Sequence, residues 1–279
     1  MDAVEFITEA QTRWLKNKSP LIIILTLTIM RKDEALLSLL QKADNEDLRV
    51  LADIITTNKK GELRPNELLT TKDKYVTYYP YNMRALVPDI VDELQCYGAN
   101  TVITLLRGGN GVCYHTILRD VAKKLKVSFN KNTSDENIER YILQKMFDDL
   151  VEKLSAEELY TLAEGMKIHL AAGLTKQVII AILQAAIRRG GFQSYIFIVV
   201  AANAIARALL GRGLSLVANA MLMRLTSMFV GPVGIALNIL WAAVDIAGPA
   251  YRVTIPAVVQ IAYIRNKVQH PEWKESLLE

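Results

Sequence analysis

The sequence predicts an all-α protein, a multi-helix bundle with a hydrophobic C-terminal helical subregion. Through the first two thirds of the chain, apolar residues recur at the three-and-four spacing of amphipathic helices. Two segments carry the hydroxyl and carboxylate pair of a helix-capping box. In the last third nearly every position is apolar, alternation is absent, and only residues 196–200, IFIVV, have local strand character.

Residues 1–32 are predicted to be an N-terminal extension with one short apolar segment. The run Leu21 to Met30 follows basic residues, as in a secretory signal, but no small-residue cleavage site comes after it. It is about half the ~20 residues that a bilayer span requires. We expect this run to pack as a buried strand-like or helical segment. The alternative is that translation begins at Met30.

Residues 33–189 form a charged amphipathic region. The leucine spacing within 33–56 predicts two helices, the second of which begins near Asp44 or Asn45. Residues 58–88 contain one glycine and three prolines and predict a long connection.

Residues 89–127 predict a helix, a tight turn and a second helix. The turn lies in the sequence RGGNG at 107–111, whose glycines also expose backbone amides that could hold an anion. This segment lacks the lysine and hydroxyl of a P-loop, which favours the turn.

Capping boxes mark the next helices. Thr133 pairs with Glu136, and Ser155 pairs with Glu158. The predicted helices are 135–153, 156–168, and a third bracketed by Gly173 and Gly190, with apolar residues Val178, Ile179, Ile182, Leu183 and Ala186.

Residues 190–266 are predicted to be a hydrophobic helical region packed on 33–189, with 267–279 as a polar tail. A helix that is hydrophobic all round must lie in a core or face lipid. The longest uncharged stretch, Leu225 to Val244, has 20 residues, but Gly231 and Pro232 interrupt it. We therefore expect short helices that pack mainly against one another.

The few charged side chains of this region need water, an acid or a phosphate. If the region is a core, acids such as Glu139 of the 135–153 helix must supply the partners. If it meets lipid, anionic head groups would serve. The candidates for buried pairs or membrane contacts are Arg207, Arg212, Arg224, Asp245, Arg252 and the aromatic Trp241.

A tyrosine group in the connection could anchor a binding surface or pack that loop on the helical body. Together with the RGGNG turn it supplies the candidate partner or anion contacts: Tyr75, Tyr78, Tyr79, Arg107, Gly108, Gly109 and Gly111.

No catalytic or metal site is predicted, and we expect no cofactor. Cys113 and His115 are two apart on a helix, so they point about 200° away from each other. The histidines and cysteines lack the spacing of metal ligands. Two cysteines cannot form a disulfide framework, which favours a reducing, cytoplasmic compartment. The net charge of +4 is spread through mixed-sign segments, which argues against a nucleic-acid partner.

Three motifs, LRGGNG, ILRDVAKKLK and AYRVTIPAVVQIA, resemble the YaaW family of uncharacterised bacterial proteins, and the likeness extends from about Asp33 to Arg265. The resemblance implies a helical fold without an assigned activity. It also implies a distant grouping with ubiquinol–cytochrome c chaperones, which would favour partner binding over catalysis.

We therefore predict a non-enzymatic interaction or assembly protein with an unidentified protein partner, which could lie peripherally on the anionic surface of the inner membrane. One alternative is a membrane-inserting, pore-forming or permeabilising protein. The other is an enzyme with an anion-binding pocket that uses Arg107 or Arg252.

Overall fold

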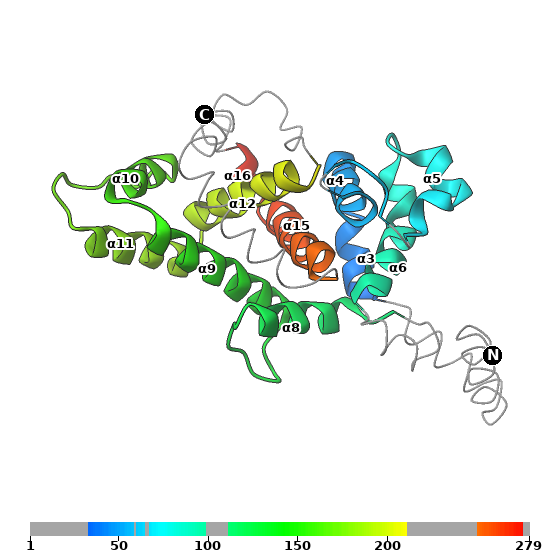
Figure 1. The fold of residues 1–279 in the computed structure, drawn as a ribbon, viewed down its shortest axis with the longest axis horizontal. Coiled ribbons are helices and arrows are strands. Elements are labelled where there is room, and N and C mark those ends of the chain that lie inside the picture. Colours follow the sequence, from blue (N-terminus) through cyan, green and yellow to red (C-terminus); the bar gives the residue numbers. More distant parts are fainter. Residues whose placement is uncertain (1–32, 59, 65–66, 99–110, 211–249, 276–279) are drawn as a thin grey trace.

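The structure is a computed structural model that describes residues 33–58, 60–64, 67–98, 111–210 and 250–275 (Figure 1). These residues contain no strand, only an isolated bridge between Thr57 and Leu63, so the all-α prediction is confirmed. The α-helices are α3 (Glu34–Leu40), α4 (Asn45–Thr56), α5 (Asp73–Tyr78), α6 (Val87–Gly98), α8 (Tyr114–Lys124), α9 (Asp135–Lys153), α10 (Ala156–Gly165), α11 (Lys176–Arg189), α12 (Phe192–Leu210), α15 (Tyr251–Gln269) and α16 (Pro271–Glu275).

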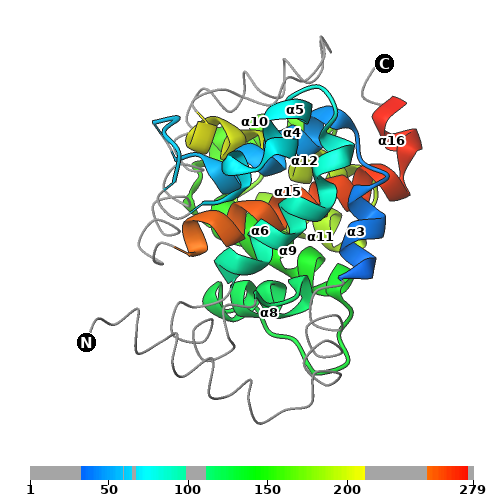
Figure 2. The same cartoon turned by 90° about the vertical axis from the view of Figure 1, so that its right-hand side faces the viewer.

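Helix α15 is the axis of the bundle. It packs against α3, α4 and α6 on one side and against α8, α9 and α12 on the other (Figure 1). Figure 2 shows the same helix running through the middle of the molecule. Its residues 253–264 are all buried. Burying each large aliphatic side chain contributes roughly 1.5–3 kcal/mol, so this helix is a main source of stability.

Helices α10 and α11 form a hairpin at the end of the molecule remote from α3 to α6 (Figure 1). The capping box of Ser155 and Glu158 is present at the start of α10, as predicted. The other predicted box is wrong by one residue, because Ser134, not Thr133, accepts the cap bond at the start of α9. The α9 range itself matches the predicted helix 135–153.

The connection over 58–88 is more ordered than predicted. It contains α5 and two 3₁₀ turns, Leu69–Thr71 and Met83–Leu86. Prolines interrupt long helices, but short helical turns can still form between them.

Helices α12 and α15 have 19 residues each, which corrects the prediction of short helices in this region. Residues 196–200 lie in α12 and have no strand structure. Helix α15 contains Pro256 and continues beyond the apolar run to Gln269, because its charged end finds partners on neighbouring helices. The predicted breaks at Gly231 and Pro232 lie outside the described residues. No helix in the described part of the chain is both long and apolar enough to cross a bilayer.

Candidate functional site

The polar end of α15 is tied to the body by partly buried ion pairs. The Arg265 guanidinium donates to both carboxylate oxygens of Glu139 at 2.7 and 3.0 Å, and the Tyr114 hydroxyl donates to the same carboxylate at 2.8 Å. Burial raises the pKa of the Glu139 carboxyl, and the bonds from Arg265 and Tyr114 oppose that shift. These contacts join α8, α9 and α15, so they stabilise the fold rather than form an open site.

A second group of ion pairs joins α15 to the start of α4. The Lys267 ammonium lies 2.6 Å from a carboxylate oxygen of Asp47 and 2.7 Å from one of Asp44. The predicted helix 135–153 thus supplies an acidic partner, Glu139, to the C-terminal region. The residue that it pairs with is Arg265, which was not among the predicted candidates. Sequence reasoning missed Arg265 because it stands one residue beyond the uncharged run.

Helix α11 presents a very different surface. Ile179, Leu183 and Ile187 are buried on its inner side. Val178, Ala181, Ile182 and Ala185 have the i, i+3, i+4, i+7 spacing that places them together on another side. Val178 and Ala181 are exposed, Val178 by 43%, and Ile182 and Ala185 are half-buried. We call these four residues the outer face of α11.

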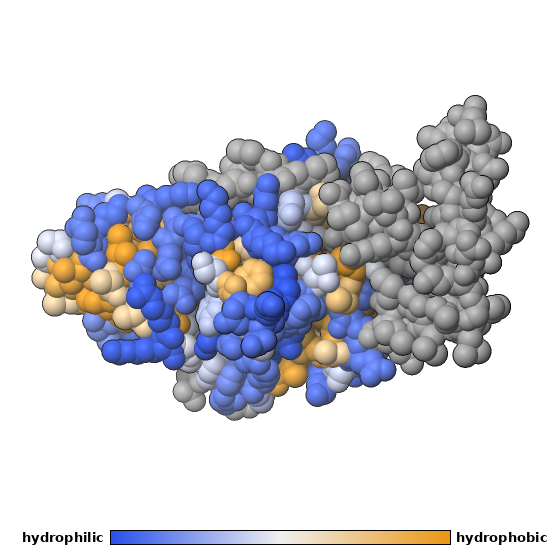
Figure 3. All heavy atoms as spheres, turned by 90° about the horizontal axis from the view of Figure 1, so that it is seen from below, coloured by the Kyte–Doolittle hydropathy of each residue, from blue (hydrophilic) through white to orange (hydrophobic). Residues whose placement is uncertain are grey.

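Figure 3 shows the end of the molecule to which this face belongs. Apolar side chains gather at the end of the molecule formed by the α10–α11 hairpin, bordered by hydrophilic residues. The loop between the two helices adds to the patch, because Ala171, Ala172 and Gly173 at its tip are exposed. The Tyr160 hydroxyl donates to Ala171 O at 2.8 Å and accepts from Leu174 N at 3.0 Å, which fixes the loop on α10.

The charges around the outer face are all positive along this part of the chain. Between Met166 and Arg189 there are two lysines, two arginines and no acidic residue. Arg188 donates to Gln184 at 3.1 Å and lies near Asp148, whereas the exposed Arg189 forms no ion pair with another described residue. The outer face is therefore apolar, and we call the lysines and arginines of its own helix and of the loop before it the basic border.

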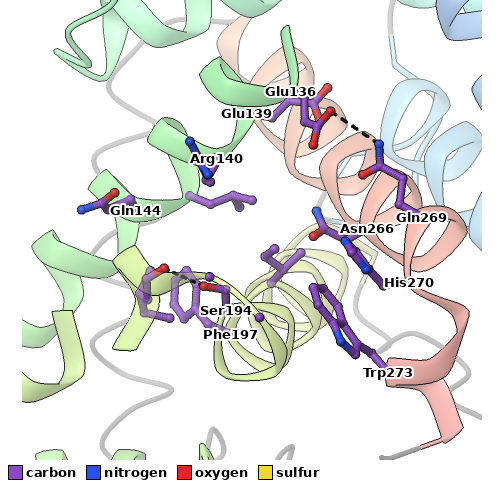
Figure 4. A pocket seen from close by; sticks show the side chains of 15 residues that line it. Glu136, Glu139, Arg140, Gln144, Ser194, Phe197, Asn266, Gln269, His270 and Trp273 are labelled. Atoms are coloured by element: carbon purple, nitrogen blue, oxygen red, sulfur yellow. Dashed lines mark hydrogen bonds between the residues drawn. The ribbon is translucent and has the colours of Figure 1, made fainter. Parts of the chain in front are cut away.

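A cavity of about 160 Å³ lies between α9, α12, α15 and α16 (Figure 4). In Figure 4, α9 lines one side, Ser194 and Phe197 lie on α12, and the opposite side carries Asn266, His270 and Trp273. Its polar side chains include Glu136, Arg140, Ser194, Asn266, Gln269 and His270. Residues from helices far apart in sequence meet here, and their spacing alone gave no signal of it.

The predicted tyrosine group packs on the body of the protein. The rings of Tyr75 and Tyr79 stack at 4.7 Å between centroids, and the Tyr79 hydroxyl donates to Asp53 at 2.9 Å. Tyr75, Tyr78 and Tyr79 all contact the core, and burial raises the pKa of the Tyr75 hydroxyl. These contacts are those of the packing alternative, and a partner contact by the same half-buried tyrosines stays a prediction.

Gly111 is the described part of the predicted turn. A side-chain carbon there would lie 2.5 Å from the carbonyl carbon of Gln95, and the next residue, Val112, donates to Gln95 O at 3.1 Å. A glycine is therefore required by the close approach of this segment to α6. The rest of that turn, Arg107, Gly108 and Gly109, lies outside the described residues.

The structure describes few of the charged candidates of the C-terminal region. Arg252 is exposed at the start of α15, with its charge near that of Arg64, and it does not line the cavity. Arg207 lies within α12, where only the backbone is described. The candidates outside the described residues are Arg212, Arg224, Trp241 and Asp245.

Cys113 and His115 have separate partners. The Cys113 sulfur lies 3.5 Å from the Thr116 hydroxyl, whereas His115 lies 2.6 Å from Asp135 and accepts from Arg119 at 2.7 Å. Within the described ranges, no three His, Cys, Asp or Glu side chains form a group that could hold a metal ion.

Comparisons with known proteins place the chain among bacterial relatives. A UPF0174 protein of Helicobacter pylori strain J99 is 40% identical over 246 residues, which cover 86% of this chain and 95% of the relative. A second UPF0174 protein of that strain is 35% identical over 208 residues, or 73% of this chain and 99% of the relative. The UPF0174 protein YaaW of Escherichia coli strain K12 is 30% identical over 245 residues, or 83% of this chain and 94% of the relative.

No family model and no solved structure matches the chain. The likeness to YaaW confirms the resemblance seen in the three sequence motifs. The chain belongs to the UPF0174 family.

Proposed function

We propose that this protein is a non-enzymatic interaction protein that attaches peripherally to the anionic surface of the inner membrane through the outer face of α11 and the loop before it. The observation that carries this proposal is the apolar outer face on a segment, residues 166–189, that contains lysines and arginines and no acidic residue. In a helix that packs only against protein, the side opposite the buried residues is normally polar.

An anionic membrane surface can interact both with the apolar residues of the outer face and with its basic border. A helix lying in the interface buries its apolar side roughly 5–10 Å into the boundary between head groups and acyl chains. Each basic residue near an anionic surface adds about 1 kcal/mol of attraction. The outer face of α11 offers Val178 and Ile182 to the first interaction, and Arg189 to the second. The loop tip at 171–173 would lie beside them in the same interface.

We infer a non-enzymatic role because the best-defined charged groups of the described region join helices to one another. The carboxylate of Glu139 receives three hydrogen bonds from Arg265 and Tyr114. Lys267 is likewise held between the acids of the α4 end. Groups engaged in this way stabilise a scaffold that presents a docking surface.

The test is cosedimentation of the full chain with vesicles of phosphatidylcholine alone or of phosphatidylcholine mixed with phosphatidylglycerol. We expect binding to the anionic vesicles only, weakening as salt rises because the attraction is screened. Val178→Glu places a charge in the outer face and should abolish the binding. Val76→Glu is the matched control, since Val76 on α5 is 75% exposed and lies at the end of the molecule away from α11 (Figure 1).

Equal loss of binding in both variants would show that the outer face has no special part. Binding that survives Val178→Glu would contradict the proposal directly. Dye release from loaded anionic vesicles separates peripheral attachment from insertion: we expect the dye to stay inside, and rapid release would favour the pore-forming alternative.

A further inference from the structure

The cavity between α9, α12, α15 and α16 is a second site, independent of the outer face of α11. We propose that it binds a small organic carboxylate, with the carboxylate held by Arg140 and the start of α12 and the organic part against the apolar wall.

Arg140 supplies the positive charge. Arg140 lines the cavity; its guanidinium donates to the neutral Asn137 side chain at 2.8 Å and lies 5.7 Å from the centre of the Tyr141 ring. It forms no ion pair with another described residue, so most of its donors can reach a ligand. An arginine matches a carboxylate with two parallel hydrogen bonds, which makes it the preferred partner of such a group.

The first turn of α12 lies on the adjacent wall, where the Ser194 hydroxyl donates to Ile187 O at 2.8 Å. Gly190 and Gly191 precede this helix with φ angles of +72° and +80°, and Gly190, Gly191 and Ser194 all line the cavity. Glycines carry no side chain that could cap the first backbone N–H groups of the helix. Those N–H groups favour an anion over a cation.

Two carboxylates, those of Glu136 and Glu139, line the cavity. Glu139 is buried and neutralised by Arg265. Glu136 is exposed at the rim, where Gln269 contacts its carboxylate at 3.5 Å. The Asn266 amide nitrogen donates to Ala262 O at 2.8 Å, which leaves its oxygen to accept from a ligand. The cavity therefore favours one negative group and has an acceptor on the opposite side.

The remaining wall is apolar and sets the size of the ligand. Leu143, Ile187, Phe197 and Ile198 line it, and Trp273, stacked on His270 at 3.7 Å, closes one side. An apolar cavity of about 150 Å³ in another protein accepts benzene. The 160 Å³ measured here thus suits a ligand of roughly six to ten non-hydrogen atoms.

Benzoate is a suitable probe, and benzamide is its uncharged counterpart of the same shape. A ligand-observed NMR titration of the full chain should show saturable binding of benzoate, and binding of benzamide at least about tenfold weaker, because a hydrogen bond to a charged group is the stronger one. Arg140→Gln should weaken benzoate binding by about tenfold or more, whereas Arg140→Lys should retain part of it.

Two further variants control for fold and location. Lys153→Gln removes a charge from the same helix at an exposed position outside the cavity and should leave the benzoate affinity unchanged. Benzoate should also change the tryptophan emission of the protein, and Trp273→Phe should remove that change while the NMR titration still reports binding. Neither Arg140→Gln nor Trp273→Phe alters the outer face of α11, so vesicle binding should persist in both.

Benzamide that binds as tightly as benzoate would overturn the proposal. So would an unchanged affinity in Arg140→Gln, or the absence of saturable binding by either probe in the millimolar range.

Discussion

Helices α15 and α11 are built from similar residues and have opposite surroundings. Helix α15 has neighbours on all sides, and residues 253–264 are buried without interruption. Helix α11 packs on α9, α10 and α12 with one side and leaves Val178 and Ala181 exposed on another. The difference shows that apolar composition alone does not decide burial; the number of neighbouring helices and the partners of each charged end do.

The largest effect is expected from the buried charge of α15. Arg265→Ala would leave the Glu139 carboxylate buried without its counterion, so we expect a loss of about 3–5 kcal/mol in the free energy of unfolding. Urea denaturation measures it. Lys123→Ala is the contrast, because the ion pair of Lys123 with Asp120 is 3.7 Å long and exposed, and its loss should cost less than about 1 kcal/mol. Similar losses in the two variants would contradict the account of α15.

Matched truncations compare the two helices directly. Ile261→Ala on α15 removes a fully buried side chain and should cost about 2–5 kcal/mol through lost contacts and a new cavity. Ile182→Ala on the outer face of α11 should cost less than about 1 kcal/mol, because the side chain is only half-buried. Denaturant midpoints of the two variants test this, and an equal cost would show that the outer face is covered within the protein.

The smallest effect is expected from the basic border. Arg189→Gln should weaken binding to phosphatidylglycerol-containing vesicles by about fivefold, which corresponds to about 1 kcal/mol. Lys131→Gln removes an exposed charge from the loop before α9 and should have no such effect. Equal weakening in both variants would indicate attraction by overall charge rather than by the border of α11.

Local patterns predicted much of the fold. The capping box at Ser155, the ranges of α9 and α11, and the start of α4 at Asn45 all follow from short-range rules of helix formation. The length of α15 does not, because a helix can continue past the end of an apolar run where the neighbouring helices supply partners for its charged residues. Glu139 does this for Arg265 from a position 126 residues away.

The candidate sites were harder to predict. In the sequence, the apolar residues of α11 form one continuous group. In the structure, Ile179 and Leu183 lie on its buried side, and Val178 and Ile182 lie on its outer face. Their spread over more than one side of the helix was the available signal. The cavity had no comparable signal, since Arg140 and His270 come together only through the packing of α15 on α9.

The most direct measurement places an environment-sensitive fluorophore on the outer face itself. With Cys96 and Cys113 replaced by serine, the single cysteine of Ile182→Cys would carry the label, and Val76→Cys would carry it in a control protein. On adding phosphatidylglycerol-containing vesicles, we expect a blue shift and protection from an aqueous quencher at position 182, and neither at position 76. A label at position 182 that stays in water on bound vesicles would contradict the assignment of α11 as the membrane-docking helix.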